Sequence, residues 1–89
     1  MTEPATPLEP RRRRVLYRAT HRGTHENDLL IGGFVAQRIR GMDETTLAAL
    51  EALLELPDPD LADWISGRRP IPPEHDAPLL RAMRAAQGK

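Results

Sequence analysis

The sequence predicts an all-α protein, a small five-helix bundle with a disordered N-terminal tail. Apolar residues recur at the three- and four-residue spacing of a helix along most of the chain. No segment alternates apolar and polar residues as a half-buried strand does. Prolines and glycines divide the helical pattern into five segments with short connections, which is typical of helical bundles.

The tail and the first helix share the N-terminal part of the chain. Residues 1–10 contain mainly proline, threonine and glutamate, with little to bury, so they are expected to form the tail. The first helix is expected at about residues 11–21, with Val15 on its buried stripe. Gly23 tolerates a positive φ, which suits the end of a helix. Because 89 residues bury one modest core, residues 11–89 are expected to form a single domain.

The second helix is expected at about residues 25–39. Its apolar residues, among them Leu30 and Phe34, cover a wide arc, which predicts a central place in the bundle. Gly32 and Gly33 interrupt it, and each costs about 1 kcal/mol relative to alanine. Close approach of a neighbouring helix is the expected reason, and a functional hinge is the alternative.

The third helix is the most clearly marked. Asp43 is a good N-cap and Pro57 stops the helix. The spacing predicts a core-facing stripe of Leu47, Leu50, Leu53 and Leu54.

The last two helices are short. Asp58 is expected to cap the fourth helix, with Pro59 at its first position and Gly67 after its end. The fifth helix is expected to begin near Asp76, with Pro78 in its first turn.

The net charge is zero, but the charges are unevenly distributed. Residues 11–40 hold eight arginines and two acids, a net charge of +6, whereas residues 41–67 hold seven acids and no base, a net charge of −7. Two interpretations stay open. Either the asymmetry marks a docking surface that orients a partner, or the oppositely charged segments face each other within the fold.

The composition also bears on the compartment. The chain has no cysteine, so it forms no disulfide and no thiolate metal site. No apolar run approaches the ~20 residues that cross a bilayer, and the N-terminal residues lack the apolar stretch of a secretory signal. The expected location is the cytoplasm, without membrane insertion.

Two histidines and a glutamate at positions 21, 25 and 26 invite comparison with a zinc site. Gly23 argues against one continuous helix through them, and Leu29 stands where an H-E-x-x-H motif needs its second histidine. We therefore expect no metal site. The sequence also has no nucleophile motif, phosphate loop or isolated carboxylate pair, so we expect no enzymatic activity.

Four consecutive arginines, Arg11 to Arg14, form a block that is able to contact phosphates. The chain is neutral, however, and its three aromatic residues are too few for a base-stacking platform. We therefore expect no nucleic-acid partner. The alternative function that stays open is that of a small nucleic-acid-associated regulatory protein that uses Arg11 to Arg14.

The segment HRGTHEND, residues 21–28, is unusually polar for a connection between two helices. Arg22 offers a fork of donors, Glu26 a carboxylate, and Gly23 an uncovered backbone, which together suit contact with another protein. The alternative is a local Arg22–Glu26 ion pair that completes the turn between the helices, and the residues alone favour this alternative.

The order of these features resembles the FAD assembly factor SdhE family, also called succinate dehydrogenase assembly factors. The resemblance covers roughly residues 11–86. It rests on RGTHE at 22–26 in register with DPDLADWISG at 58–67.

The resemblance implies a five-helix bundle that binds the flavoprotein subunit of succinate dehydrogenase, and in bacteria often that of fumarate reductase. It implies that the protein promotes covalent attachment of FAD to a histidine of this client, while the client and its flavin perform the chemistry. No cofactor would be bound stably by the chain itself. The motif positions imply partner-binding roles for Arg22, Gly23 and Glu26. The rim of this surface is expected to include His21, Thr24, His25 and Asp28.

Overall fold

A computed structural model describes residues 8–87, which form α-helices and short 3-10 helices and, within this range, no strand. The predicted all-α, five-helix architecture is confirmed. The α-helices are α1 (Pro10–Thr20), α2 (His25–Arg38), α3 (Glu44–Leu53), α4 (Asp58–Ser66) and α5 (Pro78–Gln87), and the 3-10 helices are η1 (Ile39–Gly41) and η2 (Pro73–His75).

The folded part of the chain begins earlier than the expected boundary at residue 11. Leu8 packs against the core, and α1 already starts at Pro10. Proline suits the first position of a helix because the N–H that it lacks has no helical partner there. Residues 1–7 of the expected tail lie outside the described residues.

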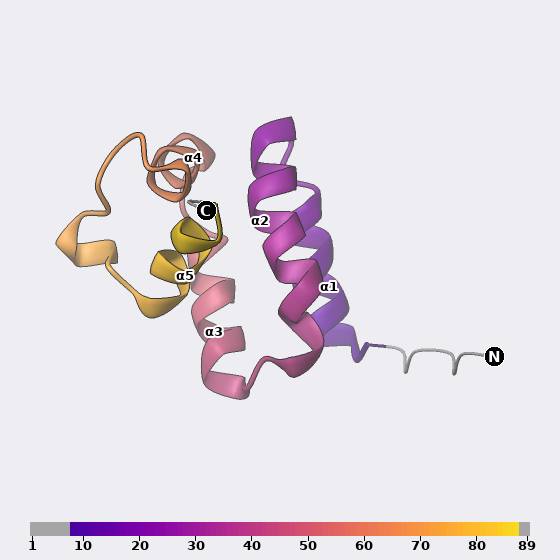
Figure 1. The fold of residues 1–89 in the computed structure, drawn as a ribbon. Helices are drawn as coiled ribbons and strands as arrows, with labels where there is room; N and C mark the ends of the chain where they lie inside the picture. Colours follow the sequence, from indigo (N-terminus) through magenta and orange to yellow (C-terminus); the bar gives the residue numbers. More distant parts are fainter. Residues whose placement is uncertain (1–7, 88–89) are drawn as a thin grey trace.

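Helix α2 lies at the centre of the bundle, as its wide apolar arc predicted. Figure 1 shows α1 and α2 side by side and running in opposite directions, with α3, α4 and α5 on the other side of α2. Ile31 and Val35 of α2 are fully buried. They share one core with Leu47 and Leu50 of α3 and with Met83 of α5.

The two adjacent glycines of α2 differ in their surroundings. A Cβ added at Gly32 would lie 2.9 Å from Cγ2 of Thr20 and 3.2 Å from the carbonyl oxygen of Ala19, so α1 approaches α2 closely here. The predicted reason for a glycine is therefore confirmed at Gly32. A Cβ added at Gly33 would meet nothing within 4 Å, so for Gly33 that prediction is wrong.

The helix ends follow the predicted signals with one exception. The carboxylate of Asp43 accepts a hydrogen bond from the Thr46 N–H at 2.8 Å, and Gly67 ends α4 with φ +86°. The expected N-cap role of Asp58 is wrong, because Pro57 occupies that position and Asp58 is the first helical residue. For the same reason Pro59 is the second helical residue, whereas the first position was predicted for it. The carboxylate of Asp58 instead accepts hydrogen bonds from other elements of the fold.

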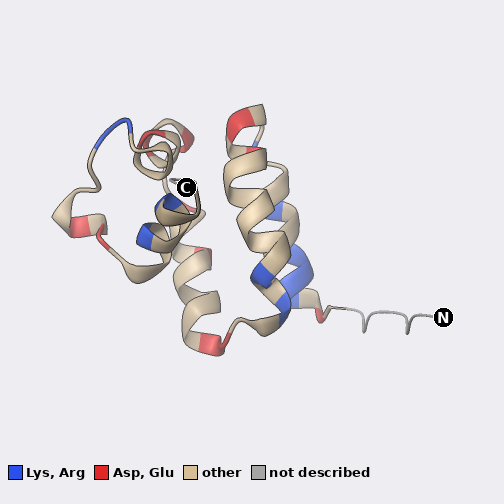
Figure 2. Ribbon diagram, viewed as in Figure 1, with Lys and Arg blue, Asp and Glu red and all other residues tan. Residues whose placement is uncertain are grey.

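The oppositely charged segments face each other across the bundle. Figure 2 shows the basic residues gathered along α1. Arg11 pairs with Glu51 at 2.6 Å and also with Glu44, and Arg18 pairs with Glu55 at 2.6 Å. The hydrogen bonds from Arg11 lower the pKa of Glu51 below its ordinary value. Much of the charge asymmetry is thus neutralised within the fold.

Arg12 and Arg13, from the same basic block, donate hydrogen bonds to backbone carbonyl oxygens, and Arg12 also pairs with the Glu9 carboxylate at 3.7 Å. Arg12 donates hydrogen bonds to the carbonyl oxygens of Ile39 at 2.5 Å and Met42 at 2.8 Å, and Arg13 donates to that of Leu8 at 2.5 Å. These contacts close the turn after α2 and the start of α1. At least three of the four arginines in the block therefore have structural roles.

The two glycines of α2 give a matched pair of variants. Gly33→Ala should raise the free energy of unfolding by about 0.5–1 kcal/mol, because alanine is the better helix former and the space is open. Gly32→Ala should lower it by roughly 1–3 kcal/mol, because the new methyl group overlaps Thr20 and the backbone of Ala19. Urea denaturation of both variants checks the prediction, and equal shifts would contradict it.

Candidate functional site

The turn between α1 and α2 forms an exposed corner of the molecule. After α1, the N–H of His21 donates to the Tyr17 carbonyl at 2.9 Å. Gly23 then adopts φ +94°, a conformation that other residues rarely take. Thr24 caps α2, its hydroxyl accepting a hydrogen bond from the Asn27 N–H at 3.4 Å. The chain therefore reverses direction and leaves the backbone of Gly23 uncovered by any side chain of its own.

Arg22 points inward from this corner. Its side chain is only 10% exposed. Nε donates to the carboxylate of Asp58 at 2.8 Å, and the two terminal nitrogens donate to the carbonyl oxygens of Leu54 at 2.7 Å and Leu56 at 3.2 Å. The guanidinium thus joins the corner to the end of α3 and the start of α4. The sequence favoured a local Arg22–Glu26 ion pair, and that prediction is wrong, because Arg22 pairs with Asp58 instead.

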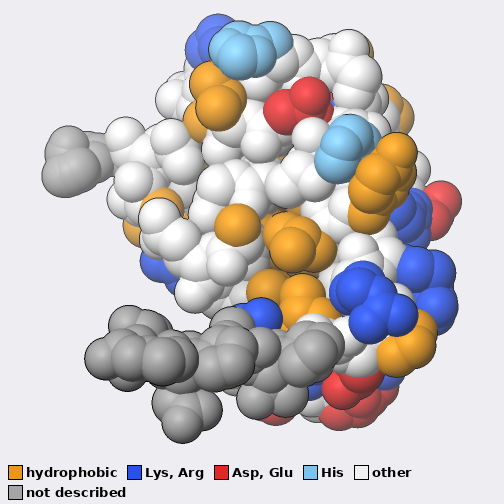
Figure 3. All heavy atoms as spheres, turned by 90° about the vertical axis from the view of Figure 1, so that its right-hand side faces the viewer, with side chains coloured by type: hydrophobic (Ala, Val, Ile, Leu, Met, Phe, Trp, Pro, Cys, Tyr) orange, Lys and Arg blue, Asp and Glu red, His pale blue; other side chains and the backbone are white. Residues whose placement is uncertain are grey.

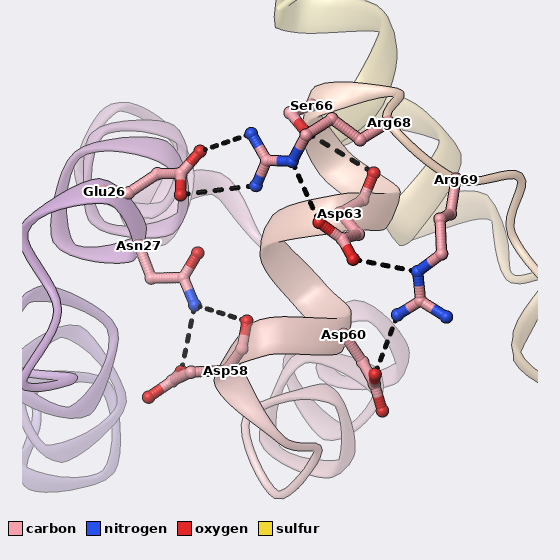
Figure 4. Close-up of polar contacts among 8 residues, drawn as sticks. All are labelled: Glu26, Asn27, Asp58, Asp60, Asp63, Ser66, Arg68 and Arg69. Atoms are coloured by element: carbon pink, nitrogen blue, oxygen red, sulfur yellow. Dashed lines mark hydrogen bonds and ion pairs between the residues drawn. The ribbon is translucent and has the colours of Figure 1, made fainter.

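Asn27 braces the same junction, as Figure 4 shows. It is 1% exposed, and its side-chain amide donates to the backbone carbonyl of Asp58 at 2.9 Å and to its carboxylate at 3.1 Å. The Asp58 carboxylate therefore accepts from both Arg22 and Asn27. Neither the role of Asn27 nor this role of Asp58 was predicted from the sequence. The spacing of four residues between Asn27 and Ile31 was the available signal, because it places the amide on the buried stripe of α2.

Glu26 is the first member of a surface chain of ion pairs (Figure 4). Its carboxylate accepts two hydrogen bonds from Arg68, at 3.0 and 3.3 Å. Arg68 also donates to Asp63 at 2.9 Å, Asp63 accepts from Arg69 at 2.8 Å, and Arg69 donates to Asp60 at 2.8 Å. Hydrogen bonds from Arg68 and then Arg69 lower the pKa of Asp63. Glu26 is about half exposed, so it remains accessible within this network.

The expected rim residues do not all face solvent. The imidazole of His21 stacks on the ring of Tyr17, with 3.9 Å between centroids and 11° between planes. Tyr17 is 63% exposed, and with His21 and Arg22 it lines a shallow hollow of about 230 Å³. His25 is exposed on the corner. The carboxylate of Asp28 is half-buried and accepts from the backbone N–H of Arg22 at 2.6 Å, so it stabilises the turn.

The face formed by α1 and α2 combines several kinds of side chain. Figure 3 shows hydrophobic side chains in its middle, with histidine and an acidic side chain above them and basic side chains below. Within residues 8–87, no three histidine, aspartate or glutamate side chains lie together in a way that suits a metal ion. None of the described helices has the length and apolar character needed to span a membrane.

A small helical bundle with a braced, solvent-facing corner is suited to contact with other proteins, and comparison with known proteins identifies its family. Residues 13–87 match the family model Sdh5, described as flavinator of succinate dehydrogenase. The chain belongs to this family. This confirms the family inferred from the RGTHE and DPDLADWISG segments.

Named relatives agree with the family model. FAD assembly factor SdhE of Acetobacter pasteurianus is 51% identical over 76 residues, which cover 85% of this chain and 70% of the relative. Mitochondrial succinate dehydrogenase assembly factor 2 of Dictyostelium discoideum is 35% identical, covering 86% of this chain and 55% of the relative. Assembly factor 2-A of Drosophila mojavensis is also 35% identical, covering 91% of this chain and 53% of the relative. The chain thus spans about half the length of these mitochondrial relatives.

The buried position of Arg22 predicts a large effect on stability. Arg22→Ala should lower the free energy of unfolding by roughly 3 kcal/mol, because it leaves the Asp58 carboxylate and two carbonyl oxygens without their donor. Arg18→Ala is the matched control. It removes a more exposed ion pair with Glu55 and should cost less than about 1 kcal/mol. Similar losses for the two variants in urea denaturation would contradict a bracing role for Arg22.

The acid response of the fold should depend on Asp63. Because its folded-state pKa is lowered by Arg68 and Arg69, the ionised form contributes stability above the unfolded-state pKa of about 4. That contribution is lost as the pH falls through the still lower folded-state pKa. Thermal melts from about pH 6 to pH 3 should therefore show a smaller fall in Tm for Asp63→Asn than for the wild type. An identical fall would show that Asp63 does not contribute.

Proposed function

We propose that this protein is an assembly factor that binds the flavoprotein subunit of succinate dehydrogenase and promotes covalent attachment of FAD to that subunit. The observation that carries the proposal is the family match over residues 13–87, together with the 51% identity to a protein named FAD assembly factor SdhE. The match includes the whole corner between α1 and α2 and the segment that braces it.

The client is proposed to dock on this corner. Gly23, Thr24, His25 and Glu26 are exposed and consecutive, so they form a compact contact surface. The bare backbone of Gly23 permits close approach, and the half-exposed carboxylate of Glu26 is available to a donor on the client. Arg22 is proposed to act as a positioning residue, because its guanidinium is turned toward Asp58 and away from solvent.

A rigid corner suits a chaperone role. A binder shifts the conformational equilibrium of its client only as far as it prefers one conformation over another. Bracing by Arg22 and Asn27 fixes the shape of the corner before contact, so that little binding energy is spent on ordering it. The preferred client conformation would be the one in which the accepting histidine and the flavin ring are correctly placed.

FAD is proposed to be the cofactor of the client, not of this chain, and the protein is proposed to be no enzyme itself. Within residues 8–87 there is no strand, so the strand–glycine loop–helix unit that often binds dinucleotides is not formed there. The flavoprotein of fumarate reductase is proposed as a second client. The expected cytoplasmic location stays a prediction that cell fractionation would check.

The nucleic-acid alternative gains no support from the geometry. Arg11 and Arg12 are engaged with carboxylates and carbonyl oxygens of the fold, and a phosphate would have to compete with these partners.

Reconstitution tests the proposed function directly. Purified flavoprotein subunit without covalent flavin is incubated with FAD, with and without this protein, and in-gel flavin fluorescence is measured after denaturation. Fluorescence should rise faster when the protein is present.

Glu26→Gln should weaken binding to the client by about tenfold, because a charge-assisted contact is lost.

Glu74→Gln provides a matched control, since it removes an exposed carboxylate of η2, away from the α1–α2 turn. With this variant, the client should bind with the wild-type affinity and flavin should attach to it at the wild-type rate. A wild-type protein that leaves the rate of flavin attachment unchanged would overturn the proposed function, whereas equal effects of the two variants would overturn the docking corner alone.

A further inference from the structure

Gly33 is exposed at the middle of α2, where no neighbouring element requires a glycine. A Cβ added there would meet nothing within 4 Å, in contrast to Gly32. Leu29, four residues earlier and therefore on the same face of the helix, is 62% exposed. The fold thus keeps a poor helix former and an exposed leucine side by side, although alanine and a polar residue would serve the isolated chain better.

These residues lie along a groove between α2 and α5. Two hollows of about 460 and 440 Å³ meet in it and share Phe34, Gln37 and Arg38 as lining residues. The first hollow reaches Leu29 and the second reaches Met42. At 1.5 Å per residue this stretch is about 20 Å long, the length of a helix of three to four turns.

The groove carries charge of one sign. Arg38 is the one charged residue among the described residues that line the two hollows. Its guanidinium lies 3.9 Å from the centre of the Phe34 ring and donates to the Phe34 carbonyl at 3.4 Å, and no described carboxylate forms an ion pair with it. Several of its N–H groups are therefore left for an occupant, which should bring a carboxylate.

The groove continues from the docking corner. Glu26, Leu29, Gly33 and Gln37 follow one another at spacings of three, four and four residues, so they form one exposed face along α2. A partner that contacts Glu26 at the corner is thereby directed along this face and into the groove.

We propose that the groove receives an α-helix of the client flavoprotein, which places a small residue against Gly33 and a carboxylate beside Arg38. The bare backbone at Gly33 lets the axis of such a helix approach α2 closely, and Leu29 and Phe34 supply the apolar contact. The inference rests on the proposed function and adds a second contact region to the corner.

Binding of purified client without covalent flavin, measured by biolayer interferometry, tests this inference. Gly33→Leu fills the groove and should raise Kd by about tenfold or more. The same change should raise the Tm of the free protein by about 4 °C, because leucine is a better helix former, so a loss of binding cannot come from unfolding. Ala48→Leu, on an exposed position of α3 outside the two hollows, should bind as the wild type does. Arg38→Gln should weaken binding and reduce its salt dependence.

The outcomes separate the two proposals. If the wild type binds the client and Gly33→Leu binds equally well, the groove is not the contact and the proposed function stands. If the wild type does not bind the client, the proposed function fails, and the groove proposal fails with it. Sedimentation that shows a dimer of the wild type and a monomer of Gly33→Leu would assign the groove to a second copy and overturn the client helix. If Arg38→Gln binds the client as tightly as the wild type does, the proposed carboxylate of the client beside Arg38 is overturned.

Discussion

The hydrogen bonds of the Arg22 guanidinium hold the two parts of this small fold together. One part is the α1–α2 hairpin, and the other is the group of α3, α4 and α5. Three donor contacts cross from the first part to the second, to Leu54, Leu56 and Asp58. They satisfy the carbonyl oxygens of Leu54, the C-cap residue of α3, and of Leu56 in the connection to α4, and they pair a half-buried carboxylate. These contacts therefore fix the corner relative to the α3–α4 connection against which it packs.

The ion pairs extend this arrangement from the interior to the surface. Glu26, on the hairpin, is connected to Arg68 in the turn that follows α4, and through Arg68 to Asp63 within α4. Surface pairs of this kind contribute little to stability one by one, but a connected set fixes the relative position of the elements that carry it. The corner is thus braced beneath by Arg22 and Asn27 and beside by Arg68. Its exposed residues are thereby held in one arrangement before any contact with a partner.

Local signals in the sequence predicted the helices, and contacts between distant residues account for what it did not predict. Asp43 and Gly67 act on their own backbone neighbourhood, so their roles followed from position alone. Asp58 has the same cap chemistry as Asp43, but Arg22, 36 residues away, recruits its carboxylate. Glu26 was expected beside Arg22 and instead pairs with Arg68, 42 residues away. The resemblance to a family implied partner contact for Arg22, Gly23 and Glu26, yet it did not show that the Arg22 side chain points inward.

The inward position of Arg22 has a consequence for inherited or engineered variants. A missense change at this residue lowers the fraction of chains that are folded, and cells remove unfolded chains with chaperones and proteases. Its phenotype would therefore follow the amount of protein that survives, and a lower growth temperature or stronger expression would compensate for it. A change at Glu26 removes a surface ion pair with Arg68 that contributes little to stability, so it leaves that supply nearly intact. On the proposed docking role, it would mainly weaken binding of the client by each surviving molecule. Changes at two positions of one motif would thus impair function for different reasons. A change at Arg22 would lower the amount of folded protein, and a change at Glu26 would weaken binding of the client.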